Sequence, residues 1–338
     1  MLIKDALIKG NNNFNLLRVF LASLVVYYHS FALFEKNGYY DPVTHYLSVV
    51  STGGLAVKSF FFLSGMLVTN SLFKNSSPVH FLQSRAKRIL PGYWFVIFIS
   101  CLIIGPILSS LKLHDYIYSP GVWDYFFNNL SFRTSYFLPG VFENSKYAFN
   151  GSIWTIPLEV KCYAVLLAIS IMCRMTSNKI SPLICILIII MPLTPFRDWL
   201  FDSNNNPAVY MLAPCFSLGC IIALCRDYSI PNPIFPALAL ISAFFINDVT
   251  LKSYMICFPF CILILYFFSS KLSLKIKMKS DPSYGMYLWA FPIQQIIANY
   301  ITTNLFLGFS LSITASLIIG RLSWNYIEKP FLKNKRAL

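Results

Sequence analysis

Apolar stretches recur along this chain, and each is near the length of about 20 residues that an α-helix needs to cross a bilayer. Of its 338 residues, 57% are hydrophobic and only 12% are charged, whereas a soluble domain carries about 25% charged residues. A soluble enzyme, a disordered chain and a disulfide-rich secreted domain are therefore excluded. The sequence predicts an all-α polytopic membrane protein with about ten transmembrane helices, at residues 14–34, 50–72, 89–111, 153–172, 180–195, 207–225, 233–249, 253–270, 283–304 and 307–327.

Positive charge is distributed unevenly between the two sides of these spans. The formal net charge is +14, which in a soluble protein would suggest a nucleic-acid partner. With the N-terminus in the cytoplasm, the inner side collects 19 Lys and Arg residues and the outer side collects six. By the positive-inside rule, this bias predicts that both termini are cytoplasmic. The charge is thus a topology signal, and membrane lipid rather than nucleic acid is the expected surrounding.

Small residues are frequent within the predicted spans. Eight of the nine cysteines fall there and Cys173 lies one residue past the fourth span; none belongs to a CxxC pair or a Cys/His metal spacing, so we expect packing residues and no metal site. The second span carries Gly53, Gly54, Ser64 and Gly65, which would let neighbouring helices approach closely.

Two ionisable residues in the first span, Arg18 and His29, carry the first functional signal. They are 11 residues apart, which on a helix is about three turns, one shared face and a rise of roughly 16 Å. Singly, Arg18 reads as a snorkelling anchor and His29 as an interfacial residue. Together they also fit an elongated ligand, with its anionic end at Arg18 in the cytoplasmic leaflet and its reactive end at His29 near the outer surface.

Three further polar residues sit at span ends. Arg85 and Arg88 project from one side of a helix at the cytoplasmic mouth of the third span, a pattern that suits phosphate but also a positive-inside stop signal. Glu159 lies near the outer end of the fourth span, at the depth of His29. A carboxylate there could fix the tautomer of His29 and raise its basicity, or form a buried ion pair with Lys161.

The longest stretch outside the spans, about residues 112–152, is rich in aromatic residues. These side chains could stack on sugar rings or form an interfacial aromatic belt. Both interpretations stay open for Tyr116, Tyr118, Trp123, Tyr125 and Phe126.

Other charged or titratable residues are expected to play minor parts. Arg321 and Glu328 are seven residues apart and are expected to close the inner end of the last span electrostatically. His45, His80 and His114 lie in loops, where solvated side chains are expected.

Six motifs occur in a fixed order, and together they make the chain resemble the integral-membrane acyltransferase-3 family, bacterial proteins that O-acylate surface polysaccharides. No single motif is specific, but the ordered set is, and it runs from residue 18 to residue 330. The motifs are Arg18 with ten residues before His29; Phe60-Phe61-Phe62-Leu63-Ser64-Gly65; Arg85-x-x-Arg88 followed by Pro91; Trp154-Thr-Ile-x-x-Glu159-x-x-Cys-Tyr163; Ser283-Tyr284-x-x-Tyr287-Leu288-Trp289; and Tyr326-Ile-Glu328-Lys329-Pro330.

The resemblance implies an acetyltransferase that uses acetyl-CoA at the inner membrane, without a metal. It implies a saccharide acceptor, either polymeric or lipid-linked, and a single transmembrane domain over residues 1–338 without an esterase-like extracytoplasmic domain. The implied catalytic residue is His29, acting as general base or forming an acyl-histidine intermediate. From its depth beside His29, Glu159 is expected to be catalytic too, by orienting His29 or stabilising its imidazolium. The motif positions further imply donor-binding residues Arg18, Arg85 and Arg88, and substrate-binding residues Trp154, Tyr163 and Tyr284.

The chain departs from the family pattern at three positions. Ala290 stands where the family usually has histidine after Leu-Trp, which puts any mechanism that needs that second histidine in doubt. Lys58 stands where an acidic residue often precedes the Phe-Phe run, and Cys162 replaces a phenylalanine beside Tyr163.

Two functions from other classes compete with this interpretation. A transporter or flippase would use Arg18, His29 and Glu159 as a polar path across the membrane. A structural subunit of a polysaccharide-assembly complex would use the same residues to join helices. Only an acyltransferase needs an acyl-CoA donor, so donor binding distinguishes the three.

Overall fold

The computed structural model describes residues 1–332 except 9, 35–37, 39, 75–76, 144, 146, 176–179, 277 and 279. The secondary structure of the described residues is helical, with one isolated β-bridge between Leu2 and Ser229. Several basic residues that enter the charge bias lie outside the described residues: Lys9, Lys36, Lys146, Lys179, Lys277, Lys279, Lys333, Lys335 and Arg336.

The predicted apolar spans coincide with helices. Seven helices of the described chain are long and apolar enough to cross a membrane, which confirms an all-α multi-pass membrane protein. They cover Phe14–Leu33, Thr52–Leu72, Pro78–Leu108, Thr155–Cys173, Pro207–Leu224, Val249–Phe268 and Leu305–Leu332. Two predicted spans correspond to shorter apolar helices, Ser181–Leu193 and Ile234–Phe245, and the span at 283–304 corresponds to the 18-residue helix Ser283–Tyr300. A total of ten crossings and cytoplasmic termini stay predictions.

The chain divides into two compact units, and helices α2, α5 and α9 contribute residues to both. The first unit comprises Met1–Val25, Tyr40–Phe81 and Lys161–Lys279. Its elements include α1 (Ile3–Ala6), α3 (Pro42–Leu47), α4 (Thr52–Lys74), α10 (Ile180–Ile190), α11 (Pro207–Tyr210), α12 (Leu212–Leu224), α13 (Ile234–Ser242) and α14 (Val249–Phe268).

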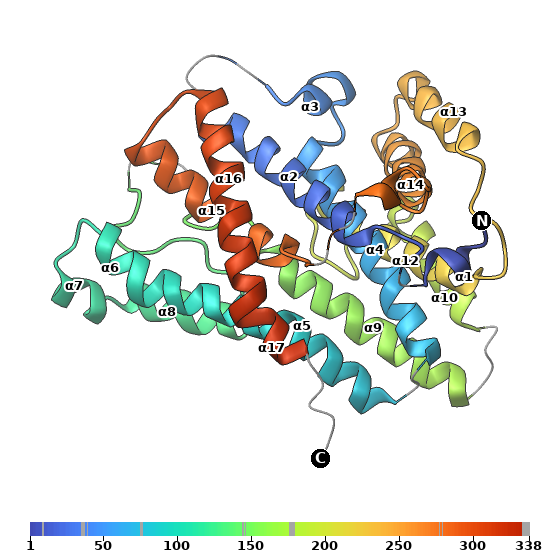
Figure 1. Ribbon diagram of the computed structural model, residues 1–338, viewed down its shortest axis with the longest axis horizontal. Helices are drawn as coiled ribbons and strands as arrows, with labels where there is room; N and C mark the ends of the chain where they lie inside the picture. Colours follow the sequence, from blue (N-terminus) through green and yellow to red (C-terminus); the bar gives the residue numbers. More distant parts are fainter. Residues whose placement is uncertain are drawn as a thin grey trace. The chain divides into compact units, whose positions relative to one another are not determined.

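Within this first unit, α4 and α12 pack backbone against backbone (Figure 1). A Cβ atom added to Gly65 of α4 would lie 2.1 Å from the carbonyl oxygen of Phe216, and one added to Gly219 of α12 would lie 2.0 Å from that of Phe62. Each helix thus offers a glycine to the main chain of the other. The sequence prediction that Gly65 permits close helix approach is confirmed, and Gly219 is its counterpart.

The second unit comprises Val26–Tyr39, Leu82–Val160 and Ser280–Leu338. It contains most of α5 (Pro78–Ile99) and the start of α9 (Thr155–Met175), together with α6 (Gly105–Leu108), α7 (Leu113–Tyr118), α8 (Pro120–Leu130), α15 (Ser283–Tyr300), α16 (Leu305–Ser323) and α17 (Lys329–Leu332). π-Helical turns at Ser100–Ile104 and Trp324–Glu328 interrupt two of the long helices. Helices α15 and α16 lie side by side (Figure 1).

The structure differs from the sequence prediction at the start of α5 and in the outer stretch. The third span was placed at 89–111, but α5 begins at Pro78, because hydropathy marks the membrane and a helix continues past it through charged residues. The outer stretch at 112–152 contains the helices α7 and α8, and Pro120 occupies a first-turn position of α8, where proline is favoured.

Candidate active site

Helix α15 is the central element of the candidate site, because three groups of functional residues meet it within the second unit. Most of its side chains are buried, including the motif residues Tyr287, Leu288 and Trp289. Of the residues predicted from sequence, the second unit holds His29, Arg85, Arg88, Trp154, Glu159 and Tyr284, and the first unit holds Arg18 and Tyr163.

His29 lies against one face of α15. Its half-buried ring meets the ring of Phe291 edge-on, with centroids 4.9 Å apart. A Cβ atom added to Gly151 would lie 2.7 Å from the Phe291 ring, so the loop before α9 closes directly over that ring. Helix α2 runs unbroken from Phe14 to Leu33 and carries both Arg18 and His29, as the sequence spacing requires.

A second face of α15 holds the segment that leads into α9. The amide of Asn150 donates to the carbonyl oxygen of Leu288 at 3.0 Å. The Tyr287 hydroxyl donates to the carbonyl oxygen of Ser152 at 2.8 Å and lies 2.7 Å from Thr155 Oγ1, from which it can accept. These bonds fix the turn that contains the half-buried Trp154 and the first turn of α9.

Glu159, one turn into α9, has two electrostatic neighbours on α15. Its carboxylate acts on the hydroxyl groups of both Tyr284 and Tyr287. Glu159 and Tyr284 therefore lie within electrostatic range of each other. The contacts described for the His29 ring are aromatic, and the pairing of Glu159 with His29 stays a prediction.

Arg88 occupies a cluster at the N-terminal end of α15. Its guanidinium donates to Asp281 at 2.7 Å and lies 3.8 Å from Glu328 Oε2. The rings of Tyr284 and Trp324 flank it, with centroids 5.7 and 5.8 Å from its Cζ atom. Two carboxylates and two aromatic rings thus hold the Arg88 guanidinium in place.

The two carboxylates of this cluster are held by serine hydroxyls. Ser283 Oγ donates to Asp281, and Ser323 Oγ donates to Glu328 at 2.9 Å. Sequence reasoning missed Asp281 and expected Glu328 to act beside Arg321, whereas the cation that Glu328 meets is Arg88. An acidic residue two positions before the motif Ser283-Tyr284 was the available signal.

Asp281→Ala should destabilise the protein far more than loss of a surface ion pair. Asp281 is 6% exposed, and its removal leaves Arg88 with one distant carboxylate, a change that costs about 3–5 kcal/mol in buried pairs. Thermal unfolding in detergent measures the effect. The matched control is Asp227→Ala, which breaks a 2.9 Å pair with Lys4 at side-chain exposures of 72% and 41% and should cost about 0–1 kcal/mol. Equal melting temperatures for the two variants would contradict a structural role for the Arg88 cluster.

Arg85 lies on α5 one turn before Arg88. It is half-buried, and its Nε donates to Ser84 Oγ at 3.2 Å. The two arginines are thus both on α5, as predicted, but only Arg88 is described within the carboxylate cluster.

Arg18 lines a cavity of about 440 Å³ in the first unit, a volume within the range of ligand pockets. The amides of Asn12, Asn13 and Asn15, at the N-terminal end of α2, share this lining. Asn13 is buried and donates to the carbonyl oxygen of Ser273 at 2.8 Å, which ties the rim of the cavity to the loop after α14. A cation, amide groups and the positive end of a helix favour an anionic ligand here.

Tyr163 is buried in the packing of the first unit. Its hydroxyl lies 2.7 Å from Ser64 Oγ, and its ring contacts those of Phe81 and Phe216. These contacts join α9 to the Phe-Phe-Phe-Leu-Ser-Gly motif of α4.

The aromatic residues of the outer stretch differ in burial, and Phe126 is half-buried. Tyr116 and Tyr125 are buried, and burial raises the pKa of both phenols, so they pack the protein interior and cannot stack on a sugar. Tyr118 and Trp123 are exposed and stay available for a sugar or a membrane interface. His45, His80 and His114 are exposed, as predicted, but they lie in the helices α3, α5 and α7 and not in loops.

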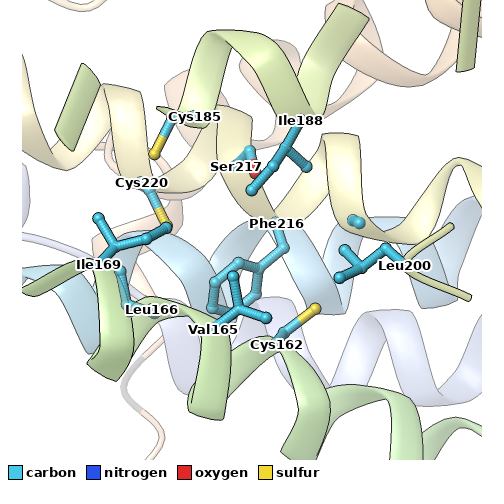
Figure 2. Close-up of a pocket in the computed structure, with 11 residues that line it drawn as sticks. Cys162, Val165, Leu166, Ile169, Cys185, Ile188, Leu200, Phe216, Ser217 and Cys220 are labelled. Carbon is cyan, nitrogen blue, oxygen red and sulfur yellow. The ribbon is translucent and has the colours of Figure 1, made fainter. Parts of the chain in front are cut away.

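The cysteines pack helices rather than form a reactive centre. All nine are free thiols, eight of them buried. Cys162, Cys185 and Cys220 line the cavity between α9, α10 and α12 in Figure 2, where their side chains lie among aliphatic ones. Its volume of about 10 Å³ is that of a single water molecule, too small for a substrate. In the described part of the chain, no three His, Cys, Asp or Glu side chains form a group that could hold a metal ion.

These observations define a class of protein. It is a multi-pass helical membrane protein with a histidine, paired arginines and a buried tyrosine-rich helix. The model of the acyltransferase domain family, acyltransferase 3, matches residues 11–321. The chain belongs to the acyltransferase-3 family and is an acyltransferase.

Two characterised relatives share sequence with the chain. An O-acetyl transferase of Shigella phage Sf6 is 27% identical over 345 aligned residues, which cover 95% of this chain and 96% of the relative. Nodulation protein 10 of Rhizobium leguminosarum bv. viciae is 27% identical over 166 residues, which cover 46% of this chain and 43% of that protein. No solved structure matches the chain significantly.

Proposed function

We propose that this acyltransferase is an O-acetyltransferase that moves the acetyl group of cytoplasmic acetyl-CoA to a sugar hydroxyl of a bacterial surface polysaccharide. The acceptor is an O-antigen, capsule or exopolysaccharide, modified at the outer face of the inner membrane. The observation that carries the proposal is the half-exposed His29, set on the ring of Phe291 in an acyltransferase-family chain. The phage O-acetyl transferase, similar along nearly its whole length, supports the acetyl group.

The proposed reaction is a thioester-to-ester exchange. The sugar hydroxyl gives its proton to His29 and attacks the thioester carbonyl; the C–O bond forms, the C–S bond breaks, and the thiolate of coenzyme A recovers the proton. In the acyl-histidine variant, a ring nitrogen of His29 attacks first and the C–S bond breaks, releasing the thiolate of coenzyme A. The sugar hydroxyl then takes the acetyl group as the N–C bond breaks, and its proton goes to the thiolate. Glu159 stabilises the imidazolium in either sequence.

Donor binding is proposed to begin at the cytoplasmic side. The Arg18 cavity receives the phosphates of coenzyme A, and the rise of roughly 16 Å along α2 matches an extended pantetheine arm that reaches toward His29. Arg85 and Arg88 contribute positive charge. A phosphate at Arg88 would also meet Asp281 and Glu328, so the main role falls to Arg18.

The acceptor side is proposed to use Trp154 and Tyr284 in the second unit, and Tyr163 in the first. The half-buried Trp154 lies in the turn fixed by Asn150 and Tyr287. We treat residues 1–338 as one transmembrane acyltransferase domain with ten crossings and both termini in the cytoplasm.

Double-labelled acetyl-CoA tests this function. Purified protein in liposomes receives acetyl-CoA with one label in the acetyl group and another in the adenine, together with crude cell-surface glycan. The expected result is acetyl label in the glycan and adenine label left in free coenzyme A. Uptake of both labels into the liposomes, without ester formation, would favour a transporter. No turnover and no saturable donor binding would refute the proposal.

Arg18→Ala should raise the KM for acetyl-CoA by about 10–100-fold, because a hydrogen bond to a charged group contributes about 1.5–3 kcal/mol. The effect on kcat should be small, since phosphate binding is shared by ground state and transition state. Steady-state kinetics at saturating glycan measures both constants. The control is Lys87→Ala, which removes an exposed cation between Arg85 and Arg88 on α5 and should leave KM unchanged. A KM unaffected by Arg18→Ala would place the phosphates elsewhere.

A further inference from the structure

The turn of α2 that carries His29 is bonded to α15 through one buried side chain. Gln294 is fully buried, and its amide nitrogen donates to both the carbonyl oxygen of Val26 and the hydroxyl oxygen of Ser30, each at 2.9 Å. Ser30 Oγ in turn donates to the same Val26 oxygen at 2.8 Å. These two acceptors lie three residues before His29 and one residue after it.

The amide nitrogen of Gln294 makes two hydrogen bonds, but the amide oxygen makes none in the described structure. This oxygen, Oε1, is buried. An unsatisfied buried acceptor is costly and rare in folded proteins. An apolar side chain of the same length would fill the space without that cost, so simple packing does not account for a glutamine here.

Phe291 and Gln294 act on the same turn from one face of α15, because they are three residues apart on that helix. Phe291 meets the His29 ring edge-on, and Gln294 bonds the backbone and the serine on either side of it. Ala290 stands where the acyltransferase-3 family usually has histidine; it is fully buried and offers only a methyl group. Gln294 therefore supplies, one turn later, a polar contact from α15 to the turn of His29.

We propose that Gln294 is a positioning residue that fixes the α2 turn of His29 for acyl transfer, a role that rests on the proposed function of His29. Helices in a membrane gain no hydrophobic driving force from packing against each other, so an interhelical hydrogen bond is an effective way to set their relative rotation. A misplacement of about 1 Å at a catalytic group costs about 10²-fold in rate.

Gln294→Met tests the proposal, because methionine keeps the length and flexibility of glutamine and removes both donors. We expect kcat for acetyl transfer to fall by about 10–100-fold with the KM for acetyl-CoA unchanged. Backbone amide exchange, followed by mass spectrometry of the peptide over residues 26–33, should become faster because this turn opens more readily. The melting temperature should not fall, since the orphaned carbonyl is removed too.

Gln295→Met is the matched control. Gln295 is the adjacent residue, is equally buried, and donates to the carbonyl oxygen of Ala148 at 2.7 Å rather than to α2. This variant should leave exchange over residues 26–33 as in the wild type and speed it around residues 147–150.

Three outcomes would overturn the proposal: an unchanged kcat in Gln294→Met, a change in melting temperature and kcat that Gln295→Met reproduces, or unchanged exchange over residues 26–33. The exchange measurement needs no turnover. If the wild type transfers no acetyl group, the proposed function fails on its own, and exchange at this turn still decides whether Gln294 fixes it.

Discussion

We expect the His29→Ala protein to insert into the membrane normally and to lose acetyl transfer by a factor of about 10²–10⁴, the usual contribution of a general acid–base group. The ring of His29 is half-buried and contacts Phe291 at one edge, so alanine removes the proton acceptor with little loss of packing. Transfer of label from acetyl-CoA to glycan measures activity, and gel filtration in detergent measures folding.

Two further substitutions sharpen the test of His29. His29→Gln keeps a polar side chain of similar size but cannot take up a proton, and it should be as inactive as His29→Ala. His45→Gln and His114→Gln alter exposed histidines of α3 and α7 and should retain wild-type activity. Retained acetylation in both His29 variants, with normal folding, would show that His29 is not catalytic.

Gly219→Val should prevent the first unit from folding. A Cβ atom at this position would lie 2.0 Å from the Phe62 carbonyl oxygen and 2.8 Å from the Met66 nitrogen, both backbone atoms of α4. Overpacking costs about 1–3 kcal/mol when side chains can yield, but here α4 and α12 themselves must separate. We expect no monodisperse protein after detergent extraction, measured by fluorescence-detected gel filtration.

The control for this packing prediction lies on α4 itself. A Cβ atom at Gly54 would meet the hydroxyl of Ser51 at 3.0 Å, a side chain that can rotate away, so Gly54→Ala should be recovered like the wild type. A normal elution profile for Gly219→Val would show that the two helices are further apart than described.

Local pattern predicts the helices of this protein because the membrane imposes it. Apolar length places the spans, and a small-residue motif places the contact made by Gly65. Helix ends are less well predicted, as Pro78 shows, because hydropathy records where lipid begins and a helix does not stop there. The helices α7 and α8 were missed since amphipathic outer helices lack the continuous apolar signal.

From the sequence, the site can be predicted only where the type of a single residue indicates a function. His29 stands out because an ionisable group in lipid is costly, and Arg88 stands out through its spacing from Arg85. Their partners do not stand out: Asp281 lies 193 residues from Arg88, and Gln294 lies 268 residues from Val26. Such pairings follow from the tertiary packing of α15, which a single sequence does not encode as a periodic pattern. For Asp281, the local signal is its position two residues before Ser283.

The π-helical turn at Trp324–Glu328 sets the angular phase at which the last helix ends. A π turn holds one residue more than the α-helical turn it replaces, and each α-helical residue advances the axis rotation by roughly 100°. With one residue of this turn deleted, Glu328 would face away from Arg88. The side chain of Tyr326, within the turn, is exposed, so its identity matters less to this contact. Chain length between Ser323 and Glu328 is therefore constrained more tightly than side-chain identity, and a one-residue deletion there is predicted to be a more severe lesion than most substitutions in the same turn.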